Sequence, residues 1–328
     1  MHSTMNTINI DLHCDLLYYL LQKGSAINDK EIGCSVPYLE DGNVKLQVMA
    51  IYAGTGAGSP AYGLEQSRLF ADLVKNENFF LFDGSNSENL ENKEGVGIIA
   101  SIENASAFCD EDQTLDSGFK NLEAIIENTQ KVFYIGITHH LENRFGGGNN
   151  ATAGLKEDGK VLIDYIADRK IAIDLAHTSD QLVYDIFNYT DQRNYSIPIL
   201  ASHSNYRAVY KNNRNLPDEL AKEVIQRNGL IGLNFIKDYV DLDHPERLYE
   251  HIQYGLDLGG EDSIAYGADY FYWKDHPDLS RHPFFFPEHA DASVYPAINK
   301  EIEKRFSSEL VEKISHRNVL TFIKNRCH

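Results

Sequence analysis

The sequence Asp11-Leu12-His13-Cys14-Asp15-Leu16-Leu17 ends an apolar, β-branched segment with two side chains that can bind a metal ion. In an extended strand His13 and Asp15 project from the same face. Leu12 and Cys14 would then face the other way. This spacing indicates half of a metal site. The alternative is that the two polar residues only finish a strand and cap the helix that follows.

Further apolar segments along the chain are typical of strands buried on both faces. The eight expected strands are 8–13, 44–52, 95–103, 132–138, 171–176, 197–202, 230–235 and 263–268. Helical spacing of apolar residues appears between them, for example at 62–76 and 115–128. Strands that alternate with helices over 328 residues predict a (β/α)8 TIM-like barrel. No linker is found, so we expect one domain over residues 1–328, with helices from 296 onward covering the barrel.

Barrels of this kind build their sites at the C-terminal ends of the strands. Six of the eight expected strands end in metal ligands or acid–base groups: His13, Asp15, Glu103, His139, His177, His203 and Asp269. One histidine at a strand end is commonly a satisfied core residue, but the joint pattern indicates a metal site. His139 and His140 are adjacent, so the alternation of a strand allows at most one of them to face that site.

The composition excludes several classes of function. The formal net charge is −19 and no basic cluster occurs, which argues against nucleic acid or an anionic membrane surface as the main partner. Neither a secretion signal nor a membrane-spanning run is found, so we expect a cytoplasmic protein. The four cysteines lie far apart without a CxxC pair, which indicates neither a thiolate zinc site nor a disulfide framework.

A series of short motifs runs in order along nearly the whole chain. They are Asp11-Leu12-His13-Cys14-Asp15, Ser101-Ile102-Glu103, Ile137-Thr138-His139, Ile173-Asp174-Leu175-Ala176-His177-Thr178-Ser179-Asp180, Ser202-His203-Ser204-Asn205, Arg214-Asn215-Leu216-Pro217-Asp218, Gly267-Ala268-Asp269 and Asp291-Ala292-Ser293-Val294-Tyr295-Pro296. In their order and spacing they resemble the membrane (renal) dipeptidase family, zinc metallopeptidase family M19, whose bacterial members are often soluble.

The resemblance implies a role for each matched residue. His13 and Asp15 would hold one zinc ion, and Glu103 would bridge it to a second. The second zinc ion would be held by His177 and His203. His139 and Arg214 would contact the substrate, and Asp269 would carry the proton. The implied enzyme is a metallo-dipeptidase with two Zn²⁺ per chain, which hydrolyses free dipeptides by a metal-bridging hydroxide and accepts C-terminal D-residues.

These residue types suit that chemistry independently of the resemblance. A carboxylate can bridge two cations, and zinc accepts mixed His and carboxylate ligands while leaving positions open for water. Asp269 could take a proton from the attacking water and pass it to the leaving amine. His139 could stabilise the developing oxyanion. The guanidinium of Arg214 could clamp the free carboxylate of the substrate, although most arginines in such polar stretches are solvated.

Two other classes of function stay open. One is another amidohydrolase-type binuclear hydrolase, acting on a lactone or another small amide or ester. The other is a barrel that binds metal without catalysis. Related hydrolases commonly carry His-x-His on the first strand and a carbamylated lysine as the bridge. This chain has His13 and Asp15 instead, with Glu103 in the bridging place, which disfavours the first alternative.

One segment departs from the family pattern. After the aspartate that matches Asp269 many members continue Phe-Asp-Gly, whereas this chain has Tyr270-Phe271-Tyr272-Trp273. The departure concerns the shape of the pocket and hence the substrate range. We interpret the aromatic loop 273–289, with His276, His282 and His289, as packing, lid or subunit contacts. The oligomeric state is open, and a homodimer is one of the alternatives.

Overall fold

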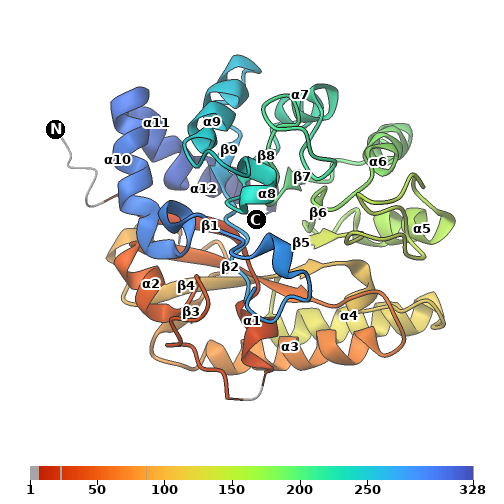
Figure 1. Ribbon diagram of the computed structural model, residues 1–328. Coiled ribbons are helices and arrows are strands. Elements are labelled where there is room, and N and C mark those ends of the chain that lie inside the picture. The colour runs from red at the N-terminus through yellow and green to blue at the C-terminus, as the bar shows by residue number, and fades with distance from the viewer. Residues whose placement is uncertain (1–6, 23, 86, 328) are drawn as a thin grey trace.

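The computed structural model describes residues 7–22, 24–85 and 87–327. Helices surround a central set of strands in the view of Figure 1. The strands are β1 Asn9–Cys14, β2 Val44–Tyr52, β3 Phe79–Leu81, β4 Val96–Glu103, β5 Val132–Gly136, β6 Ala172–Asp174, β7 Ile199–Ala201, β8 Leu230–Leu233 and β9 Ile264–Tyr266. The expectation that the first residues carry no leader falls mainly on 1–6, outside the described residues.

The parallel strands close into a barrel. The order β2-β1-β9-β8-β7-β6-β5-β4 is completed by pairing of β2 with β4 from Leu46↔Gly97 to Tyr52↔Glu103. β3 pairs with the beginning of β4, outside this ring of eight, and it was not predicted from the sequence. The eight predicted strands are those that form the ring, so the (β/α)8 prediction is confirmed.

Helices lie on the outside of the barrel and continue past its last strand (Figure 1). They are α1 Leu16–Leu20, α2 Val36–Asp41, α3 Ser59–Leu73, α4 Leu115–Thr129, α5 Glu157–Ile166, α6 Asp180–Gln192, α7 Asp218–Gln226, α8 Lys237–Val240, α9 Arg247–Asp257, α10 Tyr295–Arg305, α11 Ser308–Glu312 and α12 Asn318–Phe322. Short 3₁₀ turns are η2 Ser87–Asn92, η3 Ala105–Ala107, η4 Leu279–Arg281, η5 Pro287–His289 and η6 Ala292–Val294, and π-helical turns are η7 Lys313–Arg317 and η8 Ile323–Cys327. None of the described helices is long and apolar enough to cross a membrane.

Two apolar clusters fill the space between these elements. The larger one lies between the strands and the surrounding helices. The smaller one joins residues of the strands, such as Ile10 and Leu200, to the C-terminal helices. Its members from α12 and η8 are Val319, Phe322, Ile323 and Cys327. The C-terminal segment therefore plugs one end of the barrel, which leaves the other end for polar side chains.

Several strands end earlier than the sequence indicates, because the backbone turns sharply next to the polar residues. β6 stops at Asp174 and β9 at Tyr266, short of the expected 176 and 268. His177 and Asp269 adopt left-handed backbone angles, with φ of 61° and 65°. Such angles are uncommon for residues with a side chain and concentrate at functional positions.

The first strand also departs from simple alternation. The pairing of β1 with β2 shifts register between Asp11 and Cys14, as at a β-bulge. Leu12 packs in the inner cluster, and the next residue, His13, contacts Tyr134 of that same cluster. The prediction that Leu12 faces away from His13 is therefore wrong, because a bulge re-aims side chains that alternation would separate.

Candidate metal centre

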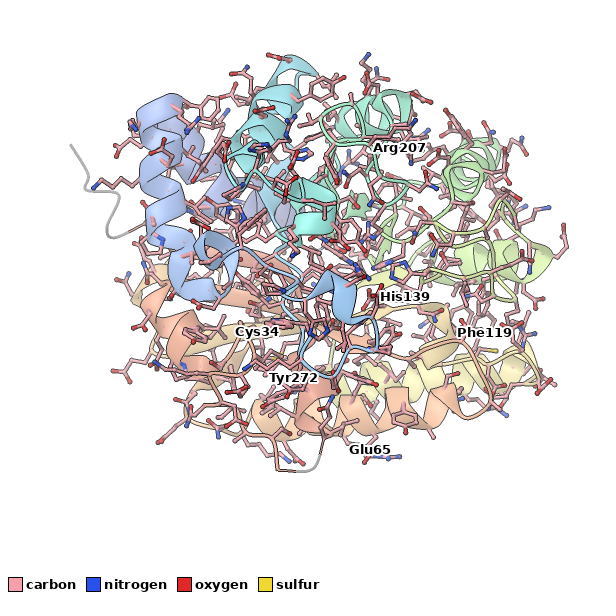
Figure 2. The ribbon with its side chains drawn as sticks, in the orientation of Figure 1. Cys34, Glu65, Phe119, His139, Arg207 and Tyr272 are labelled. Atoms are coloured by element: carbon pink, nitrogen blue, oxygen red, sulfur yellow. The ribbon has the colours of Figure 1, made fainter. Side chains whose placement is uncertain are left out.

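An open cavity of about 420 Å³ lies at the C-terminal ends of the strands. Figure 2 labels His139 there, near the middle of the view. The cavity walls include most of the candidate residues predicted from the sequence: Asp15, Glu103, His139, His177 and Asp269. His13 and His203 are fully buried directly beneath them, and their rings stack with centroids 3.8 Å apart.

The hydrogen bonds of His13 determine which of its nitrogens is free. Its Nδ1 lies 2.8 Å from the hydroxyl of Tyr134, and that hydroxyl donates to the backbone oxygen of Leu12 at 2.8 Å. Because the hydroxyl proton is already used, Tyr134 accepts from an Nδ1–H of His13. In the neutral ring the lone pair of His13 therefore lies on Nε2, a buried atom with no hydrogen-bond partner in the described protein.

His203 is oriented by the same kind of relay. The Ser202 hydroxyl donates to Asp174 Oδ2 at 2.6 Å and lies 2.6 Å from Nδ1 of His203. It therefore accepts from His203 Nδ1–H, which leaves the lone pair of the neutral ring on Nε2, 3.0 Å from Nε2 of His177. A histidine whose second nitrogen donates to a fixed acceptor is the usual arrangement of a metal ligand.

Glu103 stands between two groups of imidazoles. Its Oε2 lies 3.5 Å from Nε2 of His13. Its Oε1 lies 3.0 Å from Nε2 of His177 and 3.6 Å from Nε2 of His203. The two oxygens of one carboxylate therefore face two different sets of candidate ligands, which is the geometry that a bridging carboxylate requires.

Asp15 and Asp269 complete the group around His13. Oδ1 of each carboxylate approaches Nε2 of His13, at 4.0 Å and 3.8 Å. Asp15 stands at the N-cap position of α1 but makes no capping hydrogen bond, and its buried Oδ1 has no hydrogen-bond partner among the described residues. The alternative that Asp15 only caps a helix is thus not supported.

The donor set fits divalent metal ions. Three groups have ligand atoms all within 4.8 Å of one another: His13 with Glu103 and His203, His13 with Asp15 and Asp269, and His139 with His140 and His177. Buried atoms without partners include His13 Nε2, Asp15 Oδ1 and His177 Nδ1. Unpaired buried polar atoms are costly, so their concentration here indicates that something outside the chain satisfies them.

Burial and neighbouring charges perturb the proton affinities of the cluster. Burial would raise the pKa of Glu103, but His13, His177 and His203 hold that pKa well below its usual value. Burial raises the pKa of Asp269 to about 6, against a lowering by nearby His13. Burial lowers the pKa of His139 to about 3, so its imidazole is neutral. Perturbations of this kind are common at functional sites.

Arg214 is placed differently from the other candidates. It is only 4% exposed and does not belong to the cavity lining. Its Nη1 donates to Ser204 Oγ at 2.8 Å and its Nη2 to the backbone oxygen of His203 at 2.9 Å. Its guanidinium lies 5.7 Å from the ring of Tyr239, which does line the cavity. In the described chain no carboxylate pairs with this buried cation, and its Nε has no partner.

Sequence reasoning missed several residues of the site, among them His140 and Asn234. His140 lines the cavity together with His139, so the prediction that at most one of them faces it is wrong. The reason is that β5 ends at Gly136, so strand alternation no longer applies at these positions. Asn234 follows β8 and donates from Nδ2 to Oδ2 of Asp269 at 2.8 Å. Nothing in the sequence distinguishes this amide from a loop asparagine.

Comparisons with known proteins agree with the motifs. A family model described as membrane dipeptidase (peptidase family M19) matches residues 3–326. A Klebsiella pneumoniae protein, described only as an uncharacterized protein in the pqqA 5′ region, is 27% identical over 246 residues. That match covers 70% of this chain and 82% of the relative.

Solved structures share the fold over almost the full length. A protein described as dipeptidase AC, a metallopeptidase of family M19, aligns with a TM-score of 0.82 at 19% identity and covers 98% of this chain and 99% of its own. A metallopeptidase from Rhodobacter sphaeroides, liganded with a phosphinate mimic of the dipeptide L-Ala-D-Ala, gives 0.80 at 20% identity and covers 98% and 100%. At these identities the likeness establishes the fold alone.

Proposed function

This chain belongs to the membrane dipeptidase family, peptidase family M19, and we propose that it is a dipeptidase that works with two zinc ions. The observation that carries the proposal is the position of Glu103, whose two carboxylate oxygens face separate groups of imidazole nitrogens. Family membership implies metal ions. Their identity as zinc and their number are part of the proposal.

The residues that would hold the ions fall into two sets joined by one carboxylate. His13 and Asp15 would hold one ion, His177 and His203 the other, and Glu103 both. Bound at these positions, zinc would act as a Lewis acid on the peptide carbonyl and lower the pKa of the attacking water. The relays from Tyr134 and from Ser202 with Asp174 keep His13 and His203 in the tautomer needed for ligation.

Asp269 is proposed to transfer the proton. Its Oδ1 reaches toward the same centre as His13, while Oδ2 is held by the amide of Asn234. One oxygen is thus fixed and the other is free to accept a proton from the attacking water and give it to the leaving amine. A pKa raised by burial to about 6 suits a group that must both accept and release a proton near neutral pH.

His139 is proposed to stabilise the oxyanion. Its Nε2 lies 3.7 Å from Oε1 of Glu103, so the ring borders the place where the carbonyl would sit. Because burial keeps the imidazole neutral, the ring can donate a hydrogen bond from an N–H without adding a positive charge beside the cations. Donors fixed in advance next to a developing negative charge are among the larger contributions to catalysis.

Arg214 is proposed to bind the terminal carboxylate of the substrate. A buried guanidinium without a carboxylate partner is unfavourable, and an anionic ligand would relieve that cost. Its position behind Tyr239 means that the carboxylate would have to pass this ring to reach it. Since the liganded Rhodobacter protein holds a mimic of L-Ala-D-Ala, we include dipeptides with a C-terminal D-residue among the substrates.

The test combines metal analysis with a substrate panel. We expect about two zinc ions per chain, and hydrolysis of Ala-Ala and Ala-D-Ala but not of their C-terminal amides or of a tripeptide. Loss of a charge-assisted contact costs a few kcal/mol, so Arg214→Ala should remove about two orders of magnitude in kcat/KM and most of the preference for the free acid. Arg207→Ala is the matched control, because Arg207 pairs with Asp180 outside this cavity.

Two results would contradict the proposal. Full activity with one zinc ion per chain, or with none, would rule out the binuclear metal site. Equal wild-type rates on the acid and the amide would remove the carboxylate clamp and favour another small amide or ester as substrate.

A further inference from the structure

The segment between β9 and α10 forms the outer wall of the cavity. In Figure 1 it is the blue stretch that passes in front of the strands toward α1, and Figure 2 labels Tyr272 on it. The rings of Tyr272 and Tyr19 of α1 have centroids 5.2 Å apart, which anchors the segment on that side. Its residues Phe271, Tyr272, Asp275, His276, Pro277, Arg281 and Phe284 line the cavity.

Most charged side chains on this wall have a partner among the described residues, but one carboxylate does not. Arg281 donates from Nε to Oδ2 of Asp238 at 2.5 Å, and Lys274 is paired with Glu31. Asp278 accepts hydrogen bonds from Ser280 on its own turn. Asp275, in contrast, has neither an ion pair nor a hydrogen bond to any described residue, although it lines the cavity and is exposed.

Asp275 and Tyr18 of α1 line the same cavity. After burial, the charge of Asp275 is the next largest cause of the raised pKa of the Tyr18 phenol, and Asp15 also contributes. Tyr18 in turn contacts Tyr52 with centroids 5.4 Å apart, and both rings line the cavity. Tyr18 thus lies near both the proposed metal ligand Asp15 and the unpaired carboxylate of Asp275.

The other side of the cavity holds Arg214, which has no carboxylate partner among the described residues, next to Arg281, which pairs with Asp238. Arg281 and Arg214 lie beside Tyr239, on the elements that follow β7, β8 and β9. In the proposed function the terminal carboxylate of a dipeptide binds on this side. The scissile carbonyl would then lie at Glu103, and the side chain of the first residue would extend toward Tyr18 and Asp275.

We propose that the wall carrying Asp275 selects dipeptides whose first residue has a basic side chain, lysine or arginine. The methylene groups of such a side chain would pack along Tyr18, and its cationic group would pair with Asp275 at the cavity rim. A neutral side chain of equal length leaves the carboxylate solvated, whereas an acidic one is repelled. This inference rests on the proposed dipeptidase function and adds the substrate class.

The experiment compares Lys-Ala, norleucyl-Ala and Glu-Ala as substrates of the zinc-loaded enzyme at low salt. An ion pair at an exposed rim is worth up to roughly fivefold in kcat/KM, so Lys-Ala should exceed norleucyl-Ala by about that factor and mainly through KM. The preference should shrink in 0.5 M salt, where exposed charges are screened. Asp275→Asn should abolish it, and Asp275→Lys should shift the preference toward Glu-Ala.

Asp278→Asn is the matched control, because this exposed aspartate lies on the same segment but does not line the cavity. It should keep the wild-type ranking. Equal wild-type rates on Lys-Ala and norleucyl-Ala, or a lysine preference that survives Asp275→Asn, would overturn the inference while leaving a dipeptidase. If no dipeptide in the panel, Ala-Ala included, is hydrolysed, the proposed function itself fails.

Discussion

The two ends of the barrel are built from the same strands but are filled in opposite ways. At the N-terminal end, Phe322 and its neighbours from the last helices close the interior with apolar side chains. At the C-terminal end, histidines and carboxylates converge with several buried atoms unpaired. The difference shows that one end supplies stability while the other retains unfavourable groups for binding. Substitutions at the two ends should therefore separate stability from metal binding and catalysis.

The largest effect is expected at the bridge. Glu103→Gln removes the charge that faces both ligand sets. Both ions should therefore bind at least about a hundredfold more weakly, which exceeds the loss of affinity when a residue that only hydrogen-bonds a metal ligand is removed. Competition with a chelator of known affinity measures this. Retention of two tightly bound ions would contradict the bridging role.

At the opposite end the expected loss is one of stability. Phe322 is 4% exposed and packs edge-on against Phe133. Phe322→Ala should lower the free energy of unfolding by about 3–5 kcal/mol through lost burial and the resulting cavity. Denaturant unfolding of the metal-free protein measures it without the contribution of bound metal. Phe322→Leu is the control with a smaller loss, and kcat of the folded fraction should be unchanged in both.

Asp269→Asn distinguishes proton transfer from ligation. The amide keeps the shape of the side chain but cannot accept the proton, so kcat should fall at least about a hundredfold. The zinc content should stay near that of the wild type, since all five proposed ligands remain. Activity within a few-fold of wild type would show that Asp269 is not the proton carrier.

The smallest effect is expected at Ser202, which hydrogen-bonds the proposed metal ligand His203. Ser202→Ala breaks the relay from Asp174 to His203, and metal affinity should fall about 10- to 100-fold. Ser315→Ala is the control: this serine is equally buried, but it lies in η7, near the closed end. If both variants kept the same affinity for zinc, the relay would have no role in ligation.

Sequence reasoning located the ring strands because each is rich in apolar residues and six of the eight end in metal ligands or acid–base groups. Glu103 and His203 could be found this way, since a ligand that directly follows a buried strand stands out. His140 could not, because it lies beyond the end of β5, where the backbone no longer alternates. β3 was missed because a three-residue pairing leaves no periodicity to read.

The relays were equally invisible before the structure. Tyr134 lies within an apolar run, so its sequence context predicts a core residue, and it is one. Tyr134 also orients His13, because its hydroxyl hydrogen-bonds this histidine, which lies 121 residues earlier in the chain. Family motifs included Asp174 and Ser202, but spacing alone assigns no partner to either. Contacts between distant segments carry these roles, and local patterns do not encode them.

The closure of the barrel has a consequence for synthesis on the ribosome. β1 needs β9 as one of its two neighbours, through the pairing Asp11↔Tyr266. The helices that fill the closed end of the barrel, α12 and η8, follow β9 in the sequence and are translated after it. At ~5–20 residues per second, β1 waits roughly 10 to 50 s for that neighbour to be translated. During this time its apolar edge is unpaired, and the nascent chain is most exposed to aggregation or to capture by chaperones.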